Sequence, residues 1–256
     1  MTQSALITGG SSGIGKEFAK LFSAAGYNLV IVARDKAALD VVANDLQTQF
    51  KNTVTTIAVD LSEVGAAQKV FSEVKKHHIE IEVLVNNAGF GSSGNFWEID
   101  AQKETEEIHV NILTLTMMCK LFLPEMIERK SGKILNVASI AGFLPGPLMS
   151  VYYASKAYVL SFSTALRSEV KEKGVVVTTL CPRQTGTNFA HRADAEKRSA
   201  FTNNLLTPQQ VAKAGFEGLM RNQDIVFSDF ESAVVAFGLR FVSKSTAAAF
   251  AKKSNS

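Results

Sequence analysis

The sequence predicts one α/β domain, a doubly wound seven-stranded parallel sheet of the Rossmann type that spans residues 1–256. Short β-branched runs alternate with longer segments of helical period along the chain, which is the pattern of βαβ units. A glycine-rich turn follows the first run, and no internal repeat or low-complexity linker divides the sequence. The strands are expected at Ala5–Thr8, Asn28–Ala33, Thr53–Val59, Val83–Asn86, Lys133–Ala138, Val175–Cys181 and Asp224–Phe227.

The segments between these strands have the periodicity of crossover helices. The first, Ile14–Ala25, places its bulky apolar residues on one face and stops at Gly26, which suits the positive φ of a helix end. A late helix is expected to begin at Thr207, because this threonine cap precedes Pro208 at the first helical position. The other helices are expected at Lys36–Phe50, Ser62–Lys76, Glu104–Arg129 and Val151–Lys173.

Composition and charge exclude several classes of protein. A hydrophobic content of 46% and a charged content of 20% are ordinary for soluble globular domains, so disorder is not expected. The net charge of +3 comes without a dense basic block, which argues against a nucleic-acid partner. The N-terminus lacks a signal-peptide pattern, and the most apolar late stretch, Ser232–Val242, is too short to span a bilayer and contains Arg240. We therefore expect a cytoplasmic protein without a transmembrane segment.

The cysteines and histidines predict neither a disulfide nor a metal site. Cys119 and Cys181 lie far apart in apolar stretches, as buried thiols of a reducing compartment do. The histidines show no spacing suited to metal binding, and the two cysteines do not complete a site with them. His191 alone falls in a segment that could reach a ligand, although an exposed side chain is the better explanation. The others are His77, His78 and His109.

A nucleotide-binding turn is predicted at Thr8–Gly15, between the first strand and the first helix. Glycines allow close approach of the backbone to a pyrophosphate, and the helix start offers unpaired N–H groups and a partial positive charge. Such a turn can also be purely structural, but its place between strand and helix favours a cofactor. Its candidate contact residues are Gly9, Ser11, Ser12, Gly13, Ile14 and Gly15.

The end of the second strand favours NADP(H) over NAD(H). An NAD site usually has an acid there to bind the ribose 2′-hydroxyl, whereas this strand ends in Ala33 and Arg34. A guanidinium suits a 2′-phosphate, since it forms bidentate, charge-assisted hydrogen bonds. Asp35 beside it is the residue that speaks against this interpretation, and a solvated Arg34 without a ligand is the alternative.

A candidate catalytic set follows the fifth strand. Ser139 ends that strand, and Tyr152 and Lys156 are four residues apart at the start of a helix, so they share one face. A free phenol has a pKa near 10, and a nearby ammonium favours the phenolate, so we expect Lys156 to bring the Tyr152 pKa toward the working range. Considered alone, Ser139 would be explained as a strand-end cap.

With these motifs the sequence resembles the short-chain dehydrogenase/reductase family, from Ala5 to about Thr187. The matching positions occur in order, and Tyr152 rather than its neighbour Tyr153 has the required distance to Lys156. They are the Thr8–Gly15 turn, Asp60, Asn86-Asn87-Ala88-Gly89, Asn111, Ser139 and Tyr152-Tyr-Ala-Ser-Lys156.

The resemblance implies a role for each of these residues. Tyr152 would protonate the carbonyl oxygen, Ser139 would hold that oxygen, and Lys156 would bind the nicotinamide ribose and shift the Tyr152 pKa. Asn111 would hold a water in the proton relay that starts at Lys156. Asp60 would contact the adenine, and Asn86 and Gly89 would shape the wall beside its ribose. The remaining cofactor contacts would be Leu61, Ala88, Pro182, Thr185 and Thr187.

One position departs from the family pattern. After the sixth strand Pro182 and Thr187 match, but Arg183 stands where glycine is usual. A side chain at this place could crowd the nicotinamide, demand a positive φ, or swing outward.

The loops beyond the carboxyl ends of the strands are apolar, which predicts a hydrophobic ketone or aldehyde as substrate. Core packing is an equally good explanation for any single one of their apolar residues. The polar insertion at about 188–206 is expected to fold over the ligand. The candidate lining residues are Phe90, Ile140, Phe143, Leu144, Leu148, Met149, Phe189 and Phe201.

The sequence thus predicts an NADP(H)-dependent oxidoreductase that reduces a hydrophobic ketone or aldehyde to an alcohol, or the reverse. The main alternative is a catalytically silent NADP(H)-binding regulatory protein, and a less favoured one is an epimerase or dehydratase on the same scaffold. The resemblance also implies a homodimer or homotetramer, formed through the exposed faces of Glu104–Arg129 and Val151–Lys173. The apolar stretch Glu231–Lys253 is a candidate for the same interface or for a membrane surface.

Overall fold

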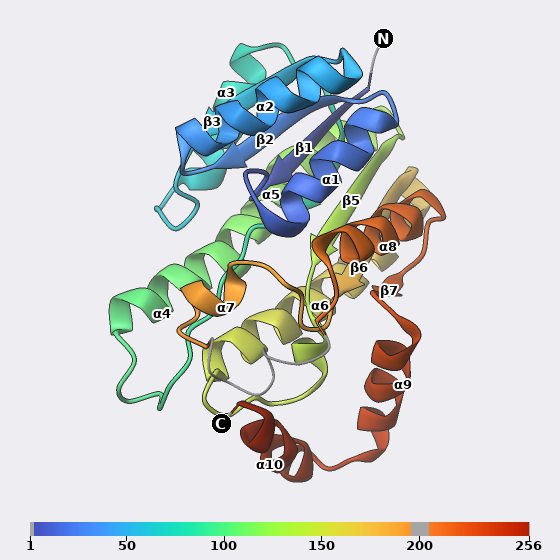
Figure 1. Cartoon of the computed structure of the whole chain (residues 1–256). Helices are drawn as coiled ribbons and strands as arrows, with labels where there is room; N and C mark the ends of the chain where they lie inside the picture. Colours follow the sequence, from blue (N-terminus) through green and yellow to red (C-terminus); the bar gives the residue numbers. More distant parts are fainter. Residues whose placement is uncertain (1–2, 196–204, 256) are drawn as a thin grey trace.

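The computed structural model describes residues 3–195 and 205–255 and confirms the seven-stranded, entirely parallel sheet (Figure 1). The strand order is β3-β2-β1-β4-β5-β6-β7. The chain therefore winds outward from β1 in both directions, and the switch point lies between β1 and β4. The strands are β1 (Ser4–Thr8), β2 (Asn28–Ala33), β3 (Val54–Ala58), β4 (Ile81–Asn86), β5 (Gly132–Val137), β6 (Val175–Cys181) and β7 (Ile225–Phe227).

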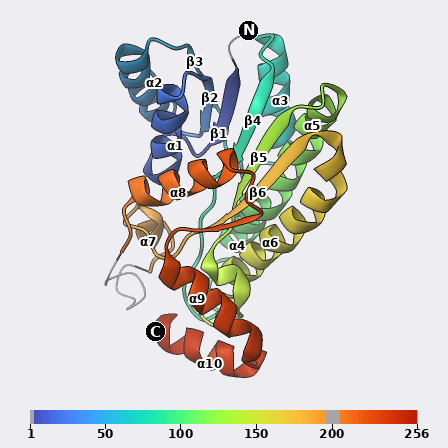
Figure 2. The same ribbon diagram turned by 90° about the vertical axis from the view of Figure 1, so that its right-hand side faces the viewer.

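Helices cover both faces of the sheet (Figure 2). One face packs against α1 (Gly13–Ala24), α2 (Lys36–Phe50) and α8 (Pro208–Met220), whose buried residues form one core cluster with the strands. The other face packs against α3 (Ala66–Lys76), α5 (Leu115–Glu128) and α6 (Ser150–Val170), which form the second cluster. The strands are buried on both sides because they lie between these two layers.

The helix ends follow the predicted signals, with one shift. Gly26 has a φ of +86° after α1, and Thr207 forms a complete capping box with Gln210 at the start of α8. The helix predicted from Ser62 begins only at Ala66. The preceding residues form a turn instead, in which the Asp60 carboxylate accepts hydrogen bonds from the Ser62 N–H and hydroxyl.

The helix predicted at Glu104–Arg129 is composite. It consists of α4 (Ala101–Ile108), one π-helical turn (His109–Thr114) and α5. By length and composition, 101–128 is the described helix that could cross a membrane. In the fold its α5 portion buries Met118, Phe122 and Met126 against the sheet, as a core helix does.

The rest of the chain gathers at the carboxyl ends of the strands. The short α7 (Phe189–Arg192) follows β6, and α9 (Phe230–Gly238) follows β7. After a short 3-10 turn (Leu239–Phe241), α10 (Lys244–Asn255) ends the described chain. Both C-terminal helices lie beyond the sheet rather than on its faces (Figures 1 and 2).

Candidate active site

A single cavity of about 920 Å³ joins the predicted nucleotide turn to the predicted catalytic residues. It runs along the carboxyl ends of the strands, where the loops of a doubly wound sheet converge. One end is lined by Gly9, Ser11, Ser12, Gly13 and Ile14, and the region beyond it by Ser139, Tyr152 and Lys156. The two predicted sites are therefore parts of one space.

The glycine turn leaves room beside the start of α1. Gly9 and Gly13 have φ values of +69° and +53°, which side chains rarely adopt. A Cβ on Gly9 would lie 2.9 Å from Asn87 Nδ2, so a larger residue would fill the cradle. Ser12, the N-cap of α1, makes no side-chain cap hydrogen bond. The first N–H groups of the helix are thus positioned for an anionic ligand, and these residues fit a dinucleotide pyrophosphate.

Gly15 has a different role from the one predicted. It does not line the cavity, and a Cβ there would lie 2.1 Å from the carbonyl oxygen of Gly9. The absence of a side chain is what lets α1 pack against the turn. Gly15 therefore shapes the nucleotide turn without facing its ligand.

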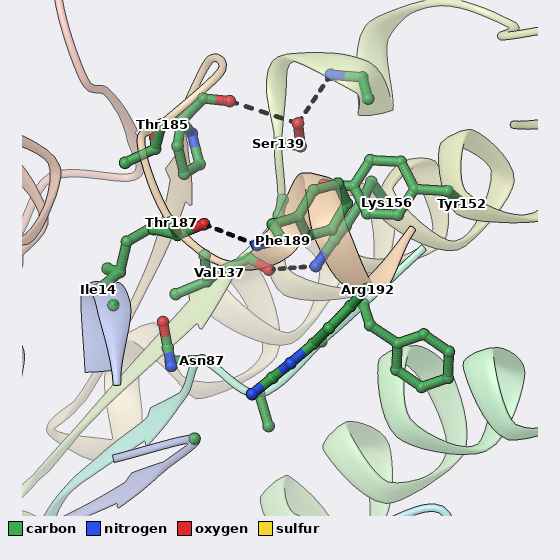
Figure 3. Close-up of a pocket in the computed structure, with 18 of the residues that line it drawn as sticks. Ile14, Asn87, Val137, Ser139, Tyr152, Lys156, Thr185, Thr187, Phe189 and Arg192 are labelled. Carbon is green, nitrogen blue, oxygen red and sulfur yellow. Dashed lines mark hydrogen bonds between the residues drawn. The ribbon is translucent and has the colours of Figure 1, made fainter. Parts of the chain in front are cut away.

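Asn86 does not line the cavity, so the prediction that it shapes the wall beside the ribose is wrong. Its neighbour Asn87 lines the cavity instead. Asn86 is buried below the cavity, where its Nδ2 donates to Asn136 Oδ1 at 2.9 Å and approaches Cys119 Sγ at 3.3 Å. Asn87 lines the cavity, and its Nδ2 donates to the Thr8 carbonyl at 2.9 Å (Figure 3). Successive residues at a strand end point to opposite sides, and this alternation separates the two asparagines.

Arg34 and Asp60 line the cavity together at the ends of β2 and β3. The Arg34 guanidinium lies 3.8 Å from the Asp60 carboxylate. Burial raises the pKa of Asp60, but hydrogen bonds from Ser62 and the Arg34 charge outweigh burial and hold the pKa below its ordinary value. Asp35 caps α2 by accepting from the Ala38 N–H at 3.0 Å. The carboxylate that spoke against NADP(H) therefore caps a helix through one oxygen while Asp35 also lines the cavity.

The cavity is also lined by residues for which the resemblance implied cofactor contacts, namely Leu61, Ala88, Gly89, Pro182, Thr185 and Thr187; those contacts stay a prediction. Thr187 accepts a hydrogen bond from the Phe189 N–H at 3.2 Å and so fixes the start of α7 (Figure 3).

The catalytic candidates Ser139, Tyr152 and Lys156 converge on one part of the cavity (Figure 3). Ser139 follows β5, and its Oγ accepts from the Ala141 N–H at 3.1 Å and donates to the Pro182 carbonyl at 3.3 Å. Lys156 is buried, and its Nζ donates to the Val137 carbonyl at 3.0 Å and lies 5.7 Å from the Tyr152 ring centroid. These contacts fix the phenol and the ammonium side by side.

Burial dominates the proton affinities here. It raises the pKa of Tyr152, against the hydrogen bond with Ser139, which lowers it. It also lowers the pKa of Lys156 to about 8, against the charge of Glu107, which raises it. The Tyr152 pKa is thus raised, contrary to the expectation that Lys156 brings it down, because burial outweighs the Ser139 hydrogen bond. Tyr152 is a protonated phenol at neutral pH.

Asn111 lies behind the cavity wall rather than on it. It is fully buried in the π-helical turn, where its Nδ2 donates to the Phe90 carbonyl at 2.9 Å and to Ser155 Oγ at 3.0 Å. A Cβ on Gly89 would approach both Asn111 Oδ1 and Lys156 Nζ, at 3.0 and 3.3 Å. The two side chains thus face the same glycine, and only that glycine keeps the space between them open. The relay role of Asn111 stays a prediction.

A buried acidic cluster beside Lys156 was missed from the sequence. The Ser92 hydroxyl lies 3.0 Å from Glu104 Oε1 and 2.8 Å from Glu107 Oε2, and all three residues are buried. A serine has one proton to donate, so one of the two carboxyl groups must itself hold a proton. Burial raises the pKa of Glu107 to about 7, with the Ser92 hydrogen bond and the Lys156 charge opposing it. The spacing Glu104, Glu107, Asn111 along one helix face was the available signal.

Arg183 lines the cavity, and its side chain turns toward the start of α9. Its φ is not positive, and its Nε lies 2.5 Å from Asp229 Oδ2, with Glu231 3.8 Å from the guanidinium. Asp229 is the N-cap of α9, where it accepts from the Ser232 N–H. The residue that replaces the usual glycine therefore fastens the C-terminal helices to the sheet.

The apolar lining agrees in part with the prediction. Phe90, Ile140, Leu144, Met149 and Phe189 line the cavity, whereas Phe143 packs against Phe227 and Leu148 lies outside. Phe201 lies outside the described residues, as does the middle of the predicted insertion. Several residues that sequence reasoning missed also contribute, namely Val110, Arg192, Val235, Leu239, Phe250 and Ala251.

Among the residues that the structure describes, no group of three or more His, Cys, Asp or Glu side chains could hold a metal ion. Cys119 and Cys181 are free and buried, as predicted, and burial raises the pKa of each thiol to about 12.

The sequence of the chain is similar to those of known proteins. Residues 3–198 match the family model described as short chain dehydrogenase. A mouse protein named very-long-chain 3-oxoacyl-CoA reductase is 36% identical over 204 residues, which cover 77% of this chain and 65% of that protein. The chain thus spans somewhat less than two thirds of the length of this relative.

Solved structures share the whole fold. A short-chain dehydrogenase from Sphingobium yanoikuyae in complex with NADPH is 30% identical with a TM-score of 0.85, covering 93% of this chain and 92% of that one. A short chain dehydrogenase/reductase from Burkholderia phymatum in complex with NAD is 25% identical with a TM-score of 0.83, covering 92% of each chain.

Proposed function

The chain belongs to the short-chain dehydrogenase/reductase family, and we propose that it transfers a hydride between NADP(H) and the carbonyl or carbinol carbon of a hydrophobic substrate. One observation carries the proposal. The cavity that begins at the glycine turn also contains Ser139, Tyr152 and Lys156, so a dinucleotide and a carbonyl group can share it. Hydride transfer needs this shared space, because both reactants must be held together away from water.

NADPH, when bound, supplies the hydride. The residues of this chain that would hold it are the glycine turn for the pyrophosphate, Asp60 and Leu61 for the adenine end, and Lys156 with Thr187 for the nicotinamide end. Burial of the Lys156 ammonium against the Val137 carbonyl orients this donor toward the cavity.

Tyr152 supplies the proton in the direction of reduction. The raised pKa of this phenol keeps it protonated at neutral pH, and an alkoxide that develops on the substrate is a stronger base than the phenolate left behind. Ser139 would hold the same oxygen by hydrogen bond. A silent nucleotide-binding protein would not require a phenol held in this way.

Arg34 supports a preference for NADP(H). Its guanidinium borders the cavity, and the neighbouring carboxylate of Asp35 is engaged in the cap of α2. A ribose 2′-phosphate would therefore meet a cation at this end of the cavity.

The substrate class follows from the lining and from the relatives. Apolar side chains of Leu144, Met149, Phe189 and Leu239 border the cavity near Tyr152. The mouse relative is named as a reductase of very-long-chain 3-oxoacyl-CoA, a thioester whose carbonyl group is attached to a long apolar chain. We infer that this chain reduces carbonyl groups attached to long or bulky apolar chains.

A panel of substrates tests the proposal. Absorbance of NADPH is followed with 3-oxoacyl thioesters of increasing chain length, bulky aryl ketones and a small polar ketone. We expect kcat/KM to rise with apolar size and NADPH to be used in preference to NADH. Turnover limited to compact charged substrates would refute the substrate class, and the absence of turnover with any carbonyl compound would refute the reaction.

Self-association through α5 and α6 belongs to the same proposal. Leu113 of the π-helical turn, Met117 of α5 and Tyr158 of α6 are more than one third exposed, and the Tyr158 hydroxyl lies 2.9 Å from Thr116 Oγ1. An exposed apolar face of this kind suits a homodimer or homotetramer. Light scattering of the purified chain gives the oligomeric state.

A further inference from the structure

The outer face of α9 carries an apolar stripe. Phe230, Val234, Phe237 and Phe241 follow one another at intervals of four, three and four residues, so they lie on one side of the helix and its 3-10 extension. They are 84%, 53%, 60% and 78% exposed. Soluble proteins rarely leave such a row of large apolar side chains in water, and a contiguous exposed row marks a contact surface.

Basic residues lie beside the stripe and on α10. The segment 230–255, from the start of α9 to the end of α10, contains Arg240, Lys244, Lys252 and Lys253 and one acidic residue, Glu231. The Arg240 guanidinium lies 5.9 Å from the Phe237 ring centroid, so cation and aromatic side chain share one surface. We call the exposed face of α9 and α10 with these cations the C-terminal face.

The C-terminal face adjoins the cavity. Val235 and Leu239 line the cavity from another side of the same helical segment, and so does Phe250 of α10, which is also 68% exposed. Figure 2 shows both helices together beyond the carboxyl end of the sheet. The Arg183–Asp229 ion pair fastens the start of α9 to the sheet.

At its other end the face is fastened through α10. Asn255 donates from Nδ2 to the Pro147 carbonyl at 3.0 Å and accepts from the Tyr153 hydroxyl at 3.2 Å. The C-terminal face is therefore held in a fixed relation to the cavity.

Charge decides between two occupants. In 230–255 the four cations outnumber the single acid, Glu231, whose carboxylate lies 3.8 Å from the Arg183 guanidinium, so a second copy seated on this face would bring together two surfaces of the same positive sign. An anionic lipid surface would instead accept the phenylalanines among its acyl chains and the cations among its headgroups. We propose that the C-terminal face docks the protein on the surface of anionic membranes, with the adjoining part of the cavity turned toward the lipid. The proposal concerns adsorption and does not depend on the proposed reaction.

Vesicle flotation tests the apolar part. The full chain is mixed with phosphatidylcholine vesicles containing phosphatidylglycerol, or with pure phosphatidylcholine vesicles. We expect flotation with the anionic vesicles, weakened by salt. The double variant Phe237→Ser/Phe241→Ser should lower the partition coefficient by about tenfold or more, because two large side chains no longer leave water on docking. The control Val64→Ser, also exposed but next to the opposite sheet edge at β3, should bind like the wild type.

A charge-reversal pair tests the electrostatic part. Arg240→Glu/Lys244→Glu should abolish the preference for anionic vesicles, because Arg240 lies against Phe237 and Lys244 begins the next helix. Lys171→Glu/Lys173→Glu changes the net charge equally at exposed positions after α6 and should leave binding within about twofold of the wild type. Circular dichroism confirms that each variant is folded, since every substituted side chain is exposed.

Three results would overturn the proposal. The first is no flotation with anionic vesicles. The second is equal flotation of the wild type and the Phe237→Ser/Phe241→Ser variant. The third is a dimer in size-exclusion chromatography that the same substitutions convert to monomer, because a second copy would then cover the face.

Discussion

The buried carboxyl of Glu107 makes a prediction about stability and pH. Burial raises its pKa from an ordinary value of 4.5 to about 7. Between these two values the folded protein holds a proton that the unfolded chain has released, so the contribution of this group to stability falls as pH rises. The contribution is fully present below pH 4.5 and is lost by pH 8, and its size is about 3 kcal/mol.

The variant Glu107→Gln removes this dependence, because its side chain is neutral at every pH. We expect the free energy of unfolding of the wild type, relative to the variant, to drop by about 3 kcal/mol between pH 4.5 and pH 8. Urea denaturation at both pH values measures this double difference. The control is Glu172→Gln, at an exposed position, where the double difference should be near zero. Parallel pH profiles for the wild type and Glu107→Gln would refute the reasoning that Ser92 and Glu107 hold a proton at neutral pH.

Three further substitutions test individual contacts. Arg34→Ala should raise the KM for NADPH by about ten- to a hundredfold in steady-state kinetics while the KM for NADH changes little, and equal changes would contradict the 2′-phosphate contact. Arg183→Gly should lower the free energy of unfolding, measured in urea, by about 1–2 kcal/mol, because the partly buried ion pair at the cap of α9 is lost and the unfolded chain gains entropy. Its kcat should stay nearly unchanged, and a large effect on kcat would place the side chain at the reacting atoms. Gly15→Ala should cost about 3 kcal/mol, because its Cβ would lie 2.1 Å from the Gly9 carbonyl oxygen, whereas Gly186→Ala, with 3.7 Å to the nearest atom, serves as the tolerated control.

The parts of the fold set by local chemistry were predictable from the sequence. The strands are continuous apolar runs, and Gly26 and Thr207 mark helix ends through φ and capping. The π-helical turn at His109–Thr114 leaves no such local signal, because its residues have ordinary helical patterning. It was therefore absorbed into one long predicted helix.

The site was predictable where the motif spacing is rigid and failed where orientation or distant packing decides. Asn86 and Asn87 are adjacent in sequence, yet only Asn87 reaches the cavity, since strand alternation turns the other inward. The direction of the Tyr152 pKa depends on burial, which the spacing to Lys156 does not convey. The contribution of α9 and α10 to the cavity arises from tertiary packing alone.

Paired tyrosine variants test the central claim most directly. NADPH oxidation with the best carbonyl substrate and NADPH binding by fluorescence are measured for the wild type, Tyr152→Phe and Tyr153→Phe. We predict that Tyr152→Phe lowers kcat by at least about a hundredfold with the Kd for NADPH nearly unchanged, because only the proton donor is lost, and that Tyr153→Phe stays within a few-fold of the wild type. Near-native kcat in Tyr152→Phe would contradict the account, as would an equal loss in both variants.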